Sequence, residues 1–308
     1  MKYLSLYCGK TMPALGLGTW QATEDVLEKA LNLALNIGYR HLDTALLYDN
    51  EKIIGKVLNE WLSSDKINRN DLFVTTKLPP IAMYKEKVFN YFQKSLTNLN
   101  LSYVDLYLLH SPLGIKNVPQ NKEDVVMDPN VNHLEIWKEM EKIYEKGLSK
   151  SIGVSNFNKE QIINILKNCK IQPSCLQLEL HLYQQQKELV EFCKRNNIVV
   201  VAYCPLGSPG LKTYYEENNK KIEIPNLFEN EAVKEMALKY KKSPAQILLR
   251  HAIDKGIGAI PKSSNENRLQ ENLDIFDFSL EEKDVIVLNG LDMGEKGSLT
   301  EWEPWGWL

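Results

Sequence analysis

The chain has 308 residues, of which 44% are apolar and 25% charged, a composition that suits a globular protein with a large core. Its formal net charge of −3 gives no electrostatic reason to expect a nucleic-acid or anionic-membrane partner. The longest apolar runs, such as residues 198–203, are far too short to span a bilayer. The first residues also lack the apolar stretch and cleavage site of a signal peptide.

The cysteines indicate a compartment rather than a site. There are five, an odd number, and no two of them form a C-x-x-C pair. Without a secretion signal they are most simply reduced thiols, so we expect a cytoplasmic protein.

Strand and helix patterns alternate along the whole chain. The first twelve residues alternate weakly around Gly9–Lys10 and predict a small hairpin. Short apolar or β-branched runs then predict strands, each followed by apolar residues at helical spacing. The expected strands are residues 14–20, 39–43, 73–77, 104–110, 151–154, 175–179, 199–203 and 257–260.

Two of the expected helices have clear end signals. Gly38 ends the first, and Ser243, Pro244 and Gln246 form a capping box with proline in the first turn. The apolar stripes expected to face inward include Val26 in the first helix and Phe89 in the third. Two long polar loops, residues 111–132 and 206–229, interrupt the alternation.

This order of elements predicts the fold. Alternating strands and helices imply a parallel sheet, and eight such units without a linker favour a (β/α)8 TIM barrel over an open doubly wound sheet. We therefore expect one α/β domain over residues 1–308, with an N-terminal β-hairpin and long loops at the strand ends.

Polar side chains stand where the expected strands end, which is where active sites of such barrels lie. Each has an ordinary structural explanation when it is taken alone, but their recurrence in register indicates a site. They are Asp43, Lys77, His110, Ser155 with Asn156, Gln177 and Tyr203.

Four residues could together protonate a carbonyl oxygen. The phenol of Tyr48, with an ordinary pKa of about 10, is a weak acid that a nearby Lys77 ammonium would strengthen. Asp43 would keep Lys77 charged, and a neutral His110 could donate to the carbonyl. The hydride for a reduction must then come from a cofactor. An alternative is a Schiff-base aldolase with Lys77 as nucleophile, although Asp43 would keep that lysine protonated.

Several motifs resemble those of the aldo-keto reductase family, in order and across essentially the whole chain. The matching segments are Gly38–Glu51, Val74–Leu78, Tyr103–Pro112, Ser151–Phe157 and Ile260–Ser263. The resemblance implies an NAD(P)H-dependent (β/α)8 reductase of aldehydes and ketones, with no metal ion. It also implies that Tyr48 is the general acid, that Lys77 and Asp43 lower its pKa, and that His110 orients the carbonyl. An alternative within the family is a regulatory protein that binds the cofactor without turnover.

The cofactor site follows from the same resemblance. A G-x-G-x-x-G fingerprint is absent, since Gly16 and Gly18 are not followed by the third glycine. The segment from Lys262 resembles an adenosine-phosphate site, where Lys262 and Arg268 at a helix N-terminus suit a 2′-phosphate and favour NADP(H) over NAD(H). The expected cofactor contacts are Thr19, Trp20, Asp43, Ser155, Asn156, Gln177, Tyr203, Cys204, Leu206, Ser208, Lys262, Ser263, Ser264, Arg268, Glu271 and Asn272.

The expected substrate is a small carbonyl compound, either an aldehyde or a bulkier, steroid-like ketone. Many family members carry aromatic residues where this chain has Ser111 and Pro79, which implies a wider pocket. The tryptophan-rich tail is expected to cover the barrel mouth, the alternative being a patch on the outside of the barrel. We also expect a monomer. The expected substrate contacts are Trp20, Tyr48, His110, Ser111 and Trp302.

Overall fold

The structure is a computed structural model that describes residues 2–116, 125–217 and 224–300. The tail tryptophans, Trp302 among them, lie outside the described residues. The expected cover over the barrel mouth therefore stays a prediction.

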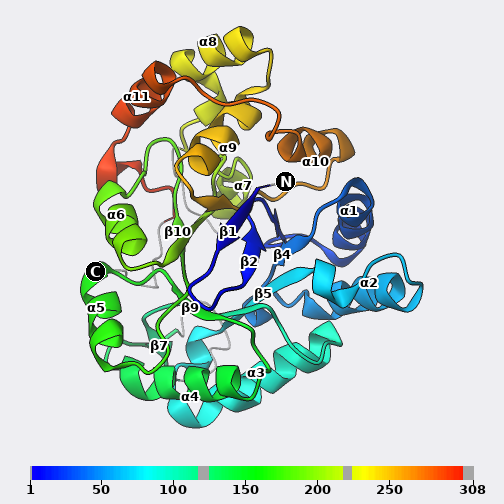
Figure 1. Cartoon of the computed structure of the whole chain (residues 1–308), viewed down its shortest axis with the longest axis vertical. Coiled ribbons are helices and arrows are strands. Elements are labelled where there is room, and N and C mark those ends of the chain that lie inside the picture. Colours follow the sequence, from blue (N-terminus) through cyan, green and yellow to red (C-terminus); the bar gives the residue numbers. More distant parts are fainter. Residues whose placement is uncertain (1, 117–124, 218–223, 301–308) are drawn as a thin grey trace.

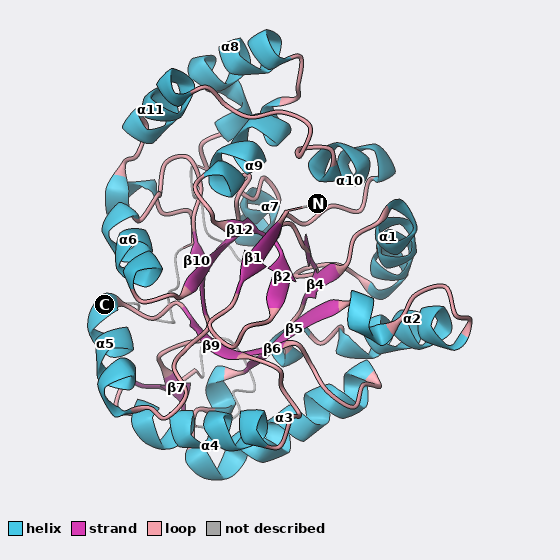
Figure 2. Ribbon diagram, viewed as in Figure 1, coloured by secondary structure: helices cyan, strands magenta, loops and turns pink. Residues whose placement is uncertain are grey.

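Eight parallel strands form one curved sheet in the order β12-β11-β10-β9-β6-β5-β4-β3 (Figure 2). The two edges of the sheet meet, because Leu15 bridges Ala259 in parallel and the N–H of Gly16 donates to the carbonyl of Ala259 at 2.9 Å. The predicted (β/α)8 barrel is confirmed. Its strands are β3 (Leu17–Gly18), β4 (His41–Asp43), β5 (Phe73–Leu78), β6 (Leu106–Leu109), β9 (Ile152–Ser155), β10 (Cys175–Glu179), β11 (Val199–Tyr203) and β12 (Gly258–Ala259).

Helices surround this sheet (Figure 1). The helices that follow the barrel strands are α1 (Glu24–Ile37), α2 (Glu51–Ser63), α3 (Lys85–Leu99), α4 (His133–Glu145), α5 (Lys159–Asn168), α6 (Lys187–Arg195), α9 (Pro244–Asp254) and α10 (Glu266–Leu273). Further helices are α7 (Leu211–Glu217), α8 (Glu231–Tyr240) and α11 (Glu282–Gly290). Within the described part of the chain, no helix has both the length and the apolar character needed to cross a membrane.

The predicted N-terminal hairpin is also confirmed. Strands β1 (Tyr3–Ser5) and β2 (Thr11–Pro13) pair antiparallel and lie across the sheet in Figure 1. The carbonyl of Pro13 lies 3.1 Å from His41 Nδ1 at the start of β4. The hairpin therefore covers the amino ends of the strands and leaves the carboxyl ends for the site.

The helix end signals are present as predicted. Gly38 ends α1 at φ 110°, a left-handed conformation that favours glycine. Ser243 Oγ accepts from the N–H of Gln246, whose side chain accepts from the N–H of Ser243. Two inward assignments were wrong, since Val26 is 41% and Phe89 37% exposed. Each lies one position beside the buried stripe of its helix.

The loops hold more structure than their composition suggested. The loop over 111–132 contains a small antiparallel pair, β7 (Gly114–Ile115) and β8 (Met127–Asp128), and the loop over 206–229 contains α7. Helix α11 was not predicted, and it leaves Ile286 64% exposed, so its sequence has no clear buried stripe. The regular part of the first barrel strand is shorter than predicted, only Leu17–Gly18.

Two buried histidines should make folding sensitive to acid. Burial lowers the pKa of His41 and of His251 from 6.5 to about 4. The unfolded chain therefore binds protons that the folded chain does not, so stability is fully present above pH 6.5 and falls as the pH approaches 4.

We predict that the free energy of unfolding falls by about 2 kcal/mol for each of these histidines between pH 7 and pH 5. Urea denaturation at the two pH values measures this change. The His251→Gln variant should show a smaller loss than the unsubstituted protein. Equal losses in both proteins would show that His251 is not a source of the acid sensitivity.

Candidate active site

A buried ion pair joins the ends of two neighbouring strands. Asp43 pairs with Thr75 in the β4–β5 register, and Lys77 lies two residues further along β5, on the same face of the sheet. Lys77 Nζ donates to Asp43 Oδ1 at 2.6 Å and to the carbonyl of Thr44 at 2.9 Å. The Lys77 side chain has no exposed surface, and Asp43 is 2% exposed.

Tyr48 lies above this pair on a 3-10 turn, Leu46–Tyr48, between β4 and α2. Its hydroxyl is 3.3 Å from Lys77 Nζ, so lysine, carboxylate and phenol form one connected chain as predicted. Asn50, two residues after Tyr48, connects this turn to the strand ends. Its side chain accepts a hydrogen bond from the hydroxyl of Thr44 and donates one to the carbonyl of Thr19, both at 2.8 Å.

Asn50 was not identified from the sequence. It is 4% exposed, and its only sequence signal is a polar residue directly before an amphipathic helix, where an ordinary helix cap is expected.

The charge on Lys77 decides which chemistry is possible. Burial favours the neutral amine, but the Asp43 carboxylate outweighs it, and the pKa of Lys77 is raised above its ordinary value. A protonated amine cannot attack a carbonyl as a nucleophile. The aldolase interpretation is therefore disfavoured.

The pKa of Tyr48 differs from the expectation. Burial raises it and the Asp43 carboxylate adds to that effect, whereas Lys77 lowers it, and the net direction is upward. Lys77 thus acts as predicted, but Asp43 acts directly in the opposite sense. The difference arises because ionising a phenol away from water is costly, and the depth of Tyr48 depends on the fold.

His110 follows β6 and lies beside the phenol. Its ring packs edge-on against Tyr48, with centroids 5.6 Å apart at 74°. Burial, with a further contribution from the Lys77 ammonium, holds the pKa of His110 well below 6.5. The imidazole is therefore neutral at physiological pH. Among the described residues, no hydrogen-bond partner reaches its buried Nδ1.

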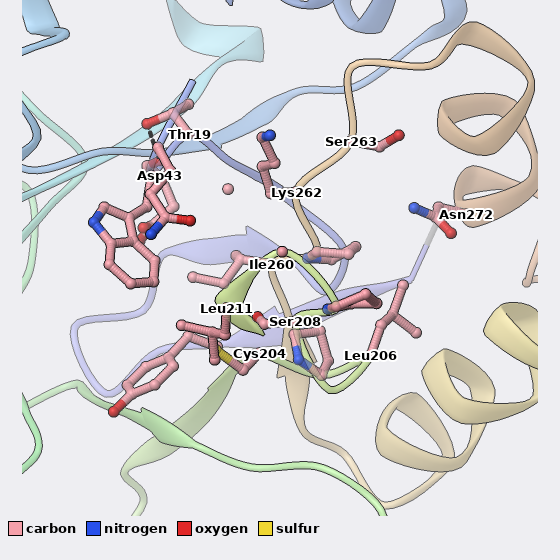
Figure 3. Close-up of a pocket in the computed structure, with 18 of the residues that line it drawn as sticks. Thr19, Asp43, Cys204, Leu206, Ser208, Leu211, Ile260, Lys262, Ser263 and Asn272 are labelled. Atoms are coloured by element: carbon pink, nitrogen blue, oxygen red, sulfur yellow. Dashed lines mark hydrogen bonds between the residues drawn. The ribbon is translucent and has the colours of Figure 1, made fainter. Parts of the chain in front are cut away.

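A cavity of about 840 Å³ starts at Asp43, Tyr48 and His110 and extends to α10. Figure 3 shows Thr19 and Asp43 on one side and Ser263 and Asn272 on the other. All of the expected cofactor contacts line this cavity. Of the expected substrate contacts, Trp20, Tyr48 and His110 do so as well.

Two expected site residues lie apart from the cavity wall. Lys77 is covered completely and acts from behind Asp43 and Tyr48. Ser111 is 3% exposed, its hydroxyl accepts from the N–H of Leu113 at 2.9 Å, and it is not among the lining residues. The prediction that Ser111 contacts substrate has no support from this placement.

Amide side chains connect the strand ends near Tyr48. Gln177 Nε2 donates to Asp43 Oδ2 at 2.6 Å, so both carboxylate oxygens of Asp43 are engaged. Asn156 has a left-handed backbone, with φ 65°, and its Nδ2 donates to the carbonyl of His110 at 3.0 Å. The hydroxyl of Tyr203 donates to Asn156 Oδ1 at 2.8 Å. This wall of the cavity is therefore held in one arrangement.

Two basic side chains lie at the other end of the cavity. Lys262 and Arg268 are exposed there, and within residues 2–116, 125–217 and 224–300 neither forms an ion pair. Asn265 caps α10 by accepting from the N–H of Arg268 at 3.0 Å. A helix N-terminus beside two cations that pair with no described residue suits an anion.

Several residues of the cavity wall were missed. The capping box predicted where α9 begins, but a local signal cannot show that the helix start faces the cavity. Leu211 was assigned to an irregular loop. The missed lining residues include Leu211, Phe228, Ser243, Pro244, Ala245 and Thr300.

Comparisons with known proteins agree with this architecture. A solved structure of the aldose reductase from Schistosoma japonicum matches with a TM-score of 0.87 at 39% identity, covering 96% of this chain and 93% of that chain. The chain is 40% identical to aldo-keto reductase family 1 member A1 of Gallus gallus, over 94% of this chain and 88% of that protein. It is 38% identical to prostaglandin F synthase 1 of Bos taurus, over 92% and 89% respectively.

The family model of the aldo/keto reductases matches residues 14–292. This match covers every strand of the barrel and the polar residues at the strand ends. The chain belongs to the aldo/keto reductase family.

Proposed function

We propose that this protein reduces the carbonyl group of aldehydes or ketones to an alcohol, with NADP(H) as its cofactor. The observation that carries the proposal is the chain of contacts from Asp43 through Lys77 to the hydroxyl of Tyr48. A neutral His110 lies beside that hydroxyl in the same cavity.

The size of the cavity and the polar side chains that line it support this choice of cofactor. Its volume of about 840 Å³ is at the upper end of ordinary ligand sites. Lys262 and Arg268 suit the 2′-phosphate because two cations with a helix N-terminus favour a phosphate group. Asn156 and Gln177 offer amide groups for the nicotinamide end. When bound, NADPH supplies the hydride that the protein itself lacks.

Tyr48 acts as the proton donor to the carbonyl oxygen. A phenol with an ordinary pKa of about 10 keeps its proton at neutral pH, and burial raises the pKa of Tyr48 further, so the proton is in place before substrate binds. As the proton leaves, the Lys77 ammonium stabilises the phenolate, since opposite charges attract strongly away from water. Asp43 keeps Lys77 charged and in place.

His110 orients the carbonyl. A neutral imidazole carries one N–H donor, and the low pKa of His110 maintains that form through the physiological range. A hydrogen bond to the carbonyl oxygen would hold it against Tyr48, which serves both proximity and charge stabilisation.

The substrate class is a small carbonyl compound, from an ordinary aldehyde to a bulkier ketone. Relatives named for aldose reduction and for prostaglandin F synthesis support this range. The cytoplasmic location and the monomeric state expected from the sequence stay predictions.

The Tyr48→Phe variant should lose about 10²–10⁴-fold in kcat, because positioned general acids contribute about that much. NADPH binding, followed by fluorescence titration, should be unchanged. Tyr84→Phe is a matched control, since the Tyr84 hydroxyl bonds Asp128 and the carbonyl of Ile115 away from the cavity. Full activity of Tyr48→Phe would refute the proposed acid.

The double variant Lys262→Ala, Arg268→Ala should raise the Kd for NADPH about tenfold or more, because it removes charge-assisted bonds to the 2′-phosphate. The Kd for NADH should change little. Lys167→Ala with Arg195→Ala removes two exposed charges elsewhere and serves as the control. Equal losses for both cofactors would contradict the assignment of the phosphate site.

A further inference from the structure

One buried carboxylate at the barrel mouth belongs to none of the groups above. Glu179 ends β10 and is 4% exposed. Its oxygens accept from the N–H of Leu299 at 2.6 Å, the hydroxyl of Ser298 at 3.1 Å and the N–H of Thr300 at 3.2 Å. The hydroxyl of Thr300 also donates to it, and His181 Nε2 lies 2.9 Å away on the other side.

The segment that Glu179 holds is fastened at its start as well. The N–H of Met293 donates to the carbonyl of Tyr183 at 2.8 Å, and Asp292 Oδ1 accepts from the N–H of Gln185 at 3.0 Å. A Cβ on Gly297 would lie 2.1 Å from the Tyr183 carbonyl oxygen. The segment therefore lies so close to the backbone of Tyr183 that only glycine fits at this position. Residues 292–300 therefore follow the loop between β10 and α6.

This segment supplies part of the cavity wall. Leu299 is buried against Leu211 and Tyr215, and Trp20 packs on the same cluster. Thr300, Leu211 and Trp20 line the cavity that contains Tyr48. Figure 3 shows Leu211 beside Cys204 on this wall. We call Leu211 and Thr300, which line the cavity, together with Leu299, which packs against Leu211 but is not among the lining residues, the apolar wall.

The set of donors requires a carboxylate. Burial raises the pKa of Glu179, but the hydrogen bonds from His181, Thr300 and Leu299 outweigh it, and the net direction is downward. An ionised carboxylate only accepts hydrogen bonds, whereas an amide in its place would turn an NH₂ group toward these donors. Charged acceptors are also the stronger ones.

We propose that Glu179 is a positioning residue that fixes the apolar wall against the part of the substrate remote from the reacting carbonyl. The proposal rests on the carbonyl reductase function above. A long-chain aliphatic aldehyde would contact the wall, whereas a short aldehyde would reach only Tyr48 and His110. Glu179 therefore selects for carbonyl compounds with an apolar body.

The test compares Glu179→Gln with Glu141→Gln. Glu141 is a matched control because it is also a buried glutamate, 8% exposed, that accepts from backbone N–H groups, those of Lys170 and Ile171. None of these three residues lines the cavity. Amide hydrogen exchange of Leu299 and Thr300 reports on the segment, and KM and kcat with propanal and nonanal report on the wall.

Glu179→Gln should speed exchange at these two amides about tenfold or more, since hydrogen bonds to charged groups stabilise by about 1.5–3 kcal/mol. KM for nonanal should rise about fivefold, the equivalent of about 1 kcal/mol of apolar contact. The kcat with nonanal and both constants for propanal should stay within about twofold of the unsubstituted protein, because no group at the reacting carbonyl changes. Glu141→Gln should leave all of these values unchanged.

Thr300→Val tests the same contact if Glu179→Gln does not fold, because it removes one donor and keeps the carboxylate. It should shift exchange and the nonanal KM in the same direction by less. Unchanged exchange, or an unchanged nonanal KM with faster exchange, would overturn the positioning role. Parent protein that reduces neither aldehydes nor ketones would overturn the proposed function, while the exchange data would still decide whether Glu179 holds the segment.

Discussion

The ion pair between Lys77 and Asp43 is the interaction on which the rest of the site depends. Both groups are withdrawn from water, and removing one partner of such a pair typically costs about 3–5 kcal/mol because a bare charge stays buried. The pair is maintained by hydrogen bonds from Gln177 to Asp43 and from Lys77 to the carbonyl of Thr44. The protein thus keeps a positive charge next to Tyr48 at a substantial cost in desolvation.

That charge and burial together set the protonation states of the neighbouring groups. It keeps His110 neutral together with burial, and it opposes the burial that raises the pKa of Tyr48. The result is a protonated phenol beside a neutral imidazole, which is the combination that a carbonyl under reduction needs. Lys262 and α10 come from near the other end of the chain. Closure of the barrel places them on the same cavity as Asp43 and Tyr48.

Much of this arrangement could be predicted because it depends on periodic and positional signals. Buried strand patterns with Asp43, Lys77 or His110 at or next to their carboxyl ends indicate both the barrel and the end that holds the candidate site. Other features depend on long-range packing. No local pattern shows that Ser111 turns away from the cavity, that Phe89 lies just outside its buried stripe, or that Glu179 meets the segment 298–300.

The direction in which the pKa of Tyr48 shifts also depends on long-range packing. Its neighbours were predicted correctly, but the balance between burial and the Lys77 charge depends on how much water the folded site excludes. The sequence predicts which charged groups are neighbours, but how far each is buried depends on the folded structure.

The most direct test follows the hydride itself. The protein is mixed with a panel of aldehydes and ketones and with NADPH that carries deuterium at the transferable position of the nicotinamide. The masses of the products are then measured by mass spectrometry. We predict an alcohol with one deuterium on the former carbonyl carbon, formed in step with cofactor oxidation. No alcohol from any carbonyl, with NADPH bound and unconsumed, would contradict it.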